Sequence, residues 1–119
     1  MLQDILKMKK KMNNNKMKTE AIDVKELKVK TELDCGFVII RLYKVPYGRI
    51  CNRNITCENR QGNMIWQVED ICTSSDASFV TITPFDNEKI IAYNWIGMYY
   101  YINIQTGKLD LVNKNARPW

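Results

Sequence analysis

Two stretches of the chain share one pattern, and this repetition is the strongest constraint on the fold. They run from Ile55 to Trp66 and from Tyr100 to Leu111. In each, alternating residues lead into a turn that contains a glycine, Gly62 or Gly107, and the alternation resumes after the turn. Such a pattern is typical of a β-hairpin. The two glycines lie 45 residues apart, which is within the range of propeller-type repeats, so the sequence predicts a β-meander.

Four loops with turn residues predict how the strands pair. These loops are Asn59 to Gly62, Asp86-Asn87, Ile96-Gly97 and Ile104 to Gly107. Together they place apolar residues opposite one another on an inner face that carries Ile55, Cys57, Met64, Trp66, Val68, Val80, Ile82, Ile91, Tyr93, Tyr100, Ile102, Leu109 and Leu111. The opposite face then carries Thr56, Ile65, Gln67, Glu69, Thr81, Thr83, Ile90, Ala92, Tyr99, Tyr101 and Asn103.

These patterns predict a mostly β protein. We expect residues 20–119 to form a single β-domain around one antiparallel meander sheet of six or more strands, propeller-blade-like or curled into a half-barrel. Residues 22–30 alternate imperfectly and predict a first strand. Residues 37–43 form an apolar run that is typical of a strand buried on both faces. Both segments are expected to cover the inner face of the sheet or to extend its edge.

The net charge of +5 belongs to the start of the chain. Residues 1–30 hold nine Lys and four acidic residues, whereas residues 31–119 hold nine basic and nine acidic residues. We expect residues 1–19 to be a basic leader, either flexible or a short helix. A basic arm for a membrane surface or nucleic acid is one interpretation; a frayed leader is favoured, because so short an isolated helix is marginal in water. We do not expect residues 31–119, whose charges balance, to bind nucleic acid.

The cysteines and the absence of histidine argue against metals and cofactors. The four cysteines include no Cys-x-x-Cys pair, and the chain has no histidine, so we predict no metal site. We see no signal-peptide pattern and no run of about 18 apolar residues. The sequence therefore predicts a cytoplasmic protein with four reduced thiols, no bound cofactor and no membrane anchor.

No catalytic signature is visible, and the expected site is a binding surface. Between Arg60 and Lys89 the chain has five acidic residues and no basic one. This stretch has three interpretations: a catalytic pair or calcium loop, a solvated loop, or an acidic patch for a basic partner. Tyr residues on the outer face are typical of protein interfaces. The predicted partner-binding residues are Glu69, Asp70, Asp76, Asp86, Glu88, Tyr99 and Tyr101, and no catalytic residue is predicted.

Two resemblances bear on function. Asn59 to Trp66 and Ile104 to Leu109 resemble the hairpin phrase of quinoprotein-type (PQQ-like) propeller repeats. Two blades cannot close a propeller, so the cofactor sites of those families are not carried over. The Gly62 to Gln67 hairpin followed by Ala92 to Gly107 is similar to small bacterial β-proteins, some of which look like immunity proteins that neutralise a polymorphic or contact-dependent toxin.

The resemblance implies a cytosolic immunity protein that binds and occludes a toxin domain, with a nuclease as the first candidate, and that performs no catalysis. Two alternatives from other classes stay open. One is a small-molecule-binding or enzymatic β-domain in which the loop at 70–78 lines a pocket. The other is a structural accessory domain. A toxin gene beside the gene for this chain would separate the three.

Overall fold

A computed structural model describes residues 20–73 and 75–112. The predicted leader, residues 1–19, lies outside the described residues. Within them are ten strands and one short 3-10 helix, in the order β1 (Glu20–Ala21), η1 (Val24–Glu26), β2 (Lys28–Asp34), β3 (Val38–Lys44), β4 (Arg49–Ile50), β5 (Ile55–Asn59), β6 (Met64–Gln67), β7 (Phe79–Pro84), β8 (Lys89–Asn94), β9 (Tyr99–Asn103) and β10 (Leu109–Leu111). The prediction of a mostly β protein is confirmed. No helix within these ranges has the length and apolar character needed to cross a membrane.

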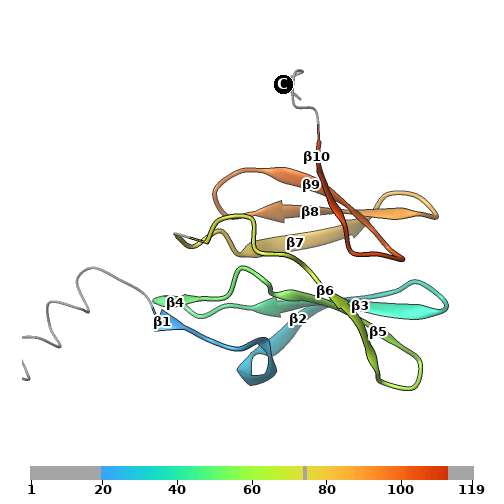
Figure 1. The fold of residues 1–119 in the computed structure, drawn as a ribbon, viewed down its shortest axis with the longest axis horizontal. Helices are drawn as coiled ribbons and strands as arrows, with labels where there is room; N and C mark the ends of the chain where they lie inside the picture. Colours follow the sequence, from blue (N-terminus) through green and yellow to red (C-terminus); the bar gives the residue numbers. More distant parts are fainter. Residues whose placement is uncertain (1–19, 74, 113–119) are drawn as a thin grey trace, which may run out of the picture.

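The strands form two antiparallel sheets that lie one on the other (Figure 1). The first sheet has the order β2-β3-β5-β6 and the second has the order β7-β8-β9-β10. Apart from β4, which pairs in parallel with β1 at the margin, each sheet follows the chain as a meander. Strand β7 lies against β2 and β3, so the first strands of the two sheets are close together.

The core lies between the two sheets, and each sheet contributes one apolar face. Trp66 and Ile82, which the sequence places inside, are 8% and 4% exposed. The buried cluster consists of Ile40, Leu42, Ile55, Cys57, Trp66, Val68, Phe79, Ile82, Ile90, Ala92 and Ile102. Two layers allow the apolar faces of both meanders to be covered, which a single open sheet cannot achieve.

The expectation of one continuous sheet, open or curled into a half-barrel, is wrong. Strands β6 and β7 do not pair, because the segment between them crosses from one layer to the other. Buried asparagines hold this crossover. The Asn52 side chain donates to the backbone oxygens of Cys72 and Ser75 at 2.9 and 2.8 Å, and its Oδ1 accepts from the Ala77 N–H at 2.7 Å.

All four predicted turns are present, but three of the four predicted registers differ from the observed ones. The β7–β8 and β8–β9 pairings differ by one residue, and the β5–β6 pairing differs by one residue at Met64 and by two at Trp66. Thr81 pairs with Tyr93, and Tyr93 pairs with Tyr99. Leu109 does pair with Ile102, as predicted. The β7–β8 and β8–β9 hairpins are lengthened at Asp86 and Asn94, whereas the β5–β6 hairpin is shortened at Asn59, whose N–H donates to the Asn63 carbonyl. The side-chain oxygens of all three residues accept backbone N–H groups of their loops. Such Asx turns compete with tight two-residue turns.

The slip changes which residues face the core. Ile90 and Ala92, predicted to face outward, are 1% and 0% exposed. Ile91 and Tyr93, predicted inside, lie on the outer side of β8 with intermediate exposure. Met64 is 49% exposed, because the β5–β6 pairing is irregular after Cys57 and shifts the end of β6 out of the core.

The first predicted strands also need correction. Residues 22–30 contain η1, whose first turn is capped by the Asp23 side chain, and a strand begins only at Lys28. The predicted strand at 37–43 corresponds to β3, but Phe37 belongs to the preceding turn and is 90% exposed. Only one face of β3 is fully buried, since Arg41 and Tyr43 point away from the second sheet and are half-buried.

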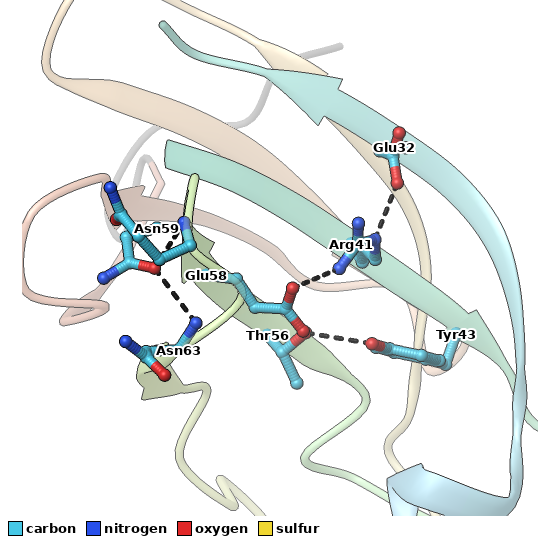
Figure 2. A network of polar contacts seen from close by, with 8 residues as sticks. Glu32, Arg41, Tyr43, Thr56, Glu58, Asn59 and Asn63 are labelled. Atoms are coloured by element: carbon cyan, nitrogen blue, oxygen red, sulfur yellow. Dashed lines mark hydrogen bonds and ion pairs between the residues drawn. The ribbon is translucent and has the colours of Figure 1, made fainter. Parts of the chain in front are cut away.

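The outer face of the first sheet is polar (Figure 2). Arg41 on β3 donates from Nε to Glu32 on β2 at 2.6 Å and from Nη1 to Glu58 on β5 at 2.5 Å. The Tyr43 and Thr56 hydroxyl groups lie 3.2 Å apart on the same face. The network spans three strands and leaves this side of the protein hydrophilic.

Candidate functional site

A groove opens at the end of the two sheets where four hairpin turns meet. Its main cavity has a volume of about 520 Å³, within the roughly 300–1,000 Å³ of typical ligand sites. An adjoining cavity of about 250 Å³ shares Cys35, Asn87 and Ile104 with it. We call the two together the turn groove. The main cavity is lined by Cys35, Phe37, Val38, Ile65, Asn87, Glu88, Asn103, Ile104 and Gln105.

One wall of the turn groove is the β2–β3 turn. The Asp34 carboxylate accepts from the Gly36 N–H at 2.9 Å, and Gly36 has a φ of +88° that favours glycine. Arg60, from the β5–β6 turn, donates to the Gly36 carbonyl at 2.8 Å and to Asp34 at 2.5 Å. These bonds to Arg60 and Gly36 hold the pKa of Asp34 below its ordinary value of 3.8. The wall is therefore fixed by two turns of the same sheet.

The facing wall is the β9–β10 turn, and its backbone is held from both sides. The Ile104 N–H donates to the Glu88 carbonyl at 2.9 Å. The Ile104 carbonyl accepts from the Trp66 indole at 2.8 Å. The Asn103 side chain accepts from the Gln105 N–H at 2.9 Å and shapes the turn itself. With both polar groups of Ile104 engaged, this wall is preorganised.

Apolar side chains and an unpaired carboxylate meet in the turn groove. Phe37 at the rim is 90% exposed, and Ile65 is 47% exposed. The exposed Glu88 side chain makes no hydrogen bond or ion pair with any described residue. The Asp34 carboxylate of the groove, in contrast, already forms an ion pair with Arg60. An exposed phenylalanine and an unpaired carboxylate that line one cavity suit a ligand that is both apolar and cationic.

The turn groove contains a thiol whose pKa is shifted. Its one thiol belongs to Cys35, and burial, followed by the nearby Asp34 charge, raises the pKa of this thiol. A protonated thiol is a poor nucleophile. The described part of the chain holds no group of three His, Cys, Asp or Glu side chains that could bind a metal.

The structure separates the acidic residues that the sequence groups together. Asp86 and Glu88 lie in the β7–β8 turn and line the turn groove. Glu69, Asp70 and Asp76 lie in the crossover before β7, at the other end of a six-residue strand that spans roughly 20 Å. Several of these carboxylates accept backbone N–H groups.

Asp70 accepts from the Cys72 N–H at 2.9 Å, Asp76 from the Ser78 N–H at 3.1 Å, and Asp86 from the Glu88 N–H at 2.8 Å. These three aspartates shape the local backbone. Glu88 and Glu69 have no such bond and remain the carboxylates that are available to a partner.

The predicted tyrosines lie on a third surface. Tyr99 and Tyr101 project from the outer face of β9, and Tyr99 is 45% exposed. Their rings contact Tyr93 at 4.5 Å and Phe85 at 4.9 Å between ring centroids. Tyr93 was predicted on the inner face, because the predicted pairings of β8 with β7 and β9 differ from the observed ones by one residue. No single face unites these tyrosines with all five predicted acids.

Sequence reasoning missed the residues that form the groove walls. Phe37 directly follows Gly36, Ile65 lies three residues after Gly62, and Ile104 is the first residue of the predicted loop from Ile104 to Gly107. Three apolar residues beside turns were the available signal. That three separate turns meet at one end of the molecule depends on the two-layer arrangement, which the sequence did not predict.

The fold and the groove define a small, two-layered all-β domain with a cavity between its turns. The chain belongs to the family described as Domain of unknown function (DUF7957), whose model matches residues 7–114. No curated protein and no solved structure matches the chain significantly.

Proposed function

We propose that the chain is a non-catalytic protein-binding domain that receives a basic and apolar segment of its partner in the turn groove. The observation that carries the proposal is that the unpaired Glu88 carboxylate and the almost fully exposed Phe37 line the same cavity, in a groove whose walls are fixed by hydrogen bonds. Fixed walls reduce the entropy lost on binding. Phe37 serves as the apolar anchor, and Glu88 selects a Lys or Arg.

We further propose that the partner is a toxin domain and that the chain acts as a cytoplasmic immunity protein. Support comes from the resemblance of its hairpins to those of toxin-neutralising proteins and from the charge of the groove. A nuclease active site is basic because it binds a polyanion. A segment from such a site would bring the required cationic side chain. Occupying it would exclude the anionic substrate without any chemical step.

The two meanders are proposed to be blade-like units of one repeated design. Each has four strands in chain order, and the repeated phrase joins the third and fourth strands in both. Two units give one sheet-to-sheet interface and leave the turns of both units at the same end. The turn groove is a product of that arrangement.

A selection experiment with random peptides tests the groove proposal, and it does not require the partner to be identified. A displayed peptide library would be panned on the full chain and, in parallel, on the variants Phe37→Ala and Glu88→Gln. We expect peptides that pair Lys or Arg with a neighbouring apolar residue to be enriched on the wild-type chain alone. Equal enrichment on all three proteins would overturn the proposal.

A second experiment tests the toxin proposal separately. Cells that produce the toxin domain encoded beside this gene would be co-transformed with the wild-type chain or with Phe37→Ala. Growth should be rescued by the wild-type chain and rescued less by the variant. If peptides bind in the groove but no neighbouring toxin is neutralised, the groove proposal stands and the toxin proposal fails.

One further candidate function has a specific observation in its favour. The volume of the main cavity, about 520 Å³, also suits a small molecule. An apolar amine would pack on Phe37 and pair with the Glu88 carboxylate. A thermal-shift screen with small amines would detect it, and stabilisation by such a compound in the absence of any peptide binding would favour this alternative.

A further inference from the structure

The two sheets are built alike, and their hairpins define equivalent residues. Asn59 and Asn103 begin the turn between the third and fourth strands of their sheets. Each side chain accepts the N–H of the residue two positions later, Gln61 or Gln105, at 3.0 and 2.9 Å. Cys57 and Tyr101 precede these asparagines by two residues and are therefore equivalent.

Strand pairing extends the equivalence across each sheet. Cys57 pairs with Ile40 on the second strand of its sheet, as Tyr101 pairs with Ile91. One row further, Ile55 pairs with Leu42, as Tyr99 pairs with Tyr93. Equivalent faces therefore consist of Ile40, Leu42, Ile55 and Cys57 in the first sheet, and of Ile91, Tyr93, Tyr99 and Tyr101 in the second.

These equivalent faces have opposite environments. All four residues of the first sheet are 0% exposed, because the second sheet covers them. The four residues of the second sheet point away from the first sheet, and no described element packs on them. We call them, with the neighbouring Phe85, the aromatic face. It is the side of the second sheet that faces away from the first sheet, where a third sheet would stack.

The other end of the stack is closed by polar groups. The outer face of the first sheet carries the Glu32–Arg41–Glu58 network of Figure 2. In repeat proteins a polar outer face caps the terminal unit. The first sheet has such a cap, whereas the second sheet presents one isoleucine and four aromatic rings.

We propose that a second copy of this chain covers the aromatic face, so that two aromatic faces pack on each other across a two-fold axis. Head-to-tail stacking would place the aromatic face against Arg41 and its carboxylates, and would cost the desolvation of three charges. A two-fold contact instead joins identical apolar patches and closes after two copies.

The charged residues at the margin of the aromatic face complement those of a second copy that is related by a two-fold axis. The Lys89 ammonium on β8 lies 5.1 Å from the centre of the Tyr101 ring, and Asp110 on β10 is the direct cross-strand neighbour of Tyr101. These opposite charges therefore flank β9. A half-turn about an axis along β9 exchanges the positions of β8 and β10. Each Lys89 then meets the partner's Asp110, which gives two reciprocal ion pairs.

The face is small, so the dimer is expected to be weak. Four strands about 4.8 Å apart and about five residues long at about 3.4 Å each give a footprint of roughly 300 Å². This is below the roughly 800 Å² per partner of a standard interface. A dissociation constant in the range of about 0.01–1 mM is expected.

Sedimentation equilibrium on the full chain, from about 10 µM to about 1 mM, tests the proposal. The mass should rise from 14.0 kDa towards twice that value. Lys89→Asp alone and Asp110→Lys alone should each raise the dissociation constant about tenfold or more, because each sets like charges against each other. An equimolar mixture of the two variants should regain association, since each chain then supplies the charge that the other lacks. Lys44→Asp, on the first sheet, is the matched control and should change nothing.

Several results would overturn the proposal: a mass of 14.0 kDa at every concentration, open-ended polymers, or a dimer that the two charge variants and their mixture leave unaffected. Thermal melts of each variant would confirm that the fold persists. The test is independent of the turn groove, because Lys89 and Asp110 do not line its cavities.

Discussion

Trp66 and Gly107 are in contact across the two sheets, and the contact leaves no room for a side chain on the glycine. A Cβ atom on Gly107 would lie 2.5 Å from Cδ2 of the Trp66 indole. Gly107 also has a φ of +77°. The two halves of the repeated phrase therefore meet, since Trp66 ends the first copy and Gly107 forms the turn of the second.

We predict that Gly107→Ala is much more destabilising than Gly62→Ala. Both glycines have positive φ, which costs an alanine about 1–2 kcal/mol. Gly62 has open space around it, whereas at Gly107 the methyl group would overlap the indole and cost a further ~1–3 kcal/mol. Denaturant melts of the two variants measure the difference. Equal losses of stability would show that Trp66 does not pack on this turn.

Trp66 should contribute through both its packing and its indole N–H. Its substitution by alanine is expected to cost about 3–5 kcal/mol, because an 8% exposed aromatic side chain is removed from the core. Trp66→Phe keeps a ring but loses the bond to Ile104, and should cost about 1–2 kcal/mol. Thermal or urea unfolding of both variants checks the order. A Phe variant as unstable as the Ala variant would contradict it.

Asn54 joins the two sheets by hydrogen bonds that no other residue type reproduces. Its side-chain amide donates to the carbonyls of Tyr43 and Phe79 at 2.9 and 2.8 Å, and its Oδ1 accepts the Phe79 N–H at 3.0 Å. Asn54→Ala leaves these buried groups unpaired and should cost about 3 kcal/mol or more.

The control for this prediction is Asn63→Ala. Asn63 is exposed and is bonded only through its backbone, so its substitution should cost less than about 0.5 kcal/mol. A third variant, Asn54→Asp, keeps the shape of the side chain but sets an oxygen against both carbonyls. If Asn54→Asp melted like the wild-type chain, the proposed role of Asn54 would be wrong.

The buried thiols should make the fold sensitive to alkaline pH. Burial, and then the nearby Cys35 and Glu58, raises the pKa of Cys57 from 9.0 to about 11. A thiol whose folded pKa exceeds its unfolded pKa contributes stability that is complete below pH 9 and is lost as pH rises towards 11. The loss is up to about 3 kcal/mol. Urea unfolding at pH 8 and pH 11 measures it, and Cys57→Ala should show a smaller pH-dependent loss than the wild-type chain. An identical loss would contradict the assignment to Cys57.

Particular residues show how far the sequence could predict the fold. Gly62 and Gly107 identified hairpins because glycine is the residue that tolerates positive φ. Asn59, Asp86 and Asn94 were equally visible, but the sequence does not show which backbone N–H groups each side chain accepts, because that depends on the folded loop. A difference of one residue then exchanged Ile91 and Tyr93 with Ile90 and Ala92.

The candidate site was less predictable than the fold. Glu88 was named from the run of acidic residues, and the structure places it in the turn groove. Phe37 was assigned to a buried strand, because an apolar run looks the same whether its first residue begins the strand or ends the turn. The groove also needs β7 to lie against β2. That contact follows from the crossover bonds of Asn52, which no local pattern in the sequence reveals.

The most direct test of the account is a binding titration of a peptide selected on the wild-type chain, repeated at several salt concentrations. Phe37→Ala should weaken binding by about 2 kcal/mol, mainly through faster dissociation. Glu88→Gln should slow association and reduce its dependence on salt. Tyr47→Ala and Glu69→Gln are the matched controls, since both residues are exposed and lie away from the turn groove. We expect weaker or slower binding for Phe37→Ala and Glu88→Gln, and wild-type binding for Tyr47→Ala and Glu69→Gln. Wild-type affinity and salt dependence in both Phe37→Ala and Glu88→Gln would contradict the account.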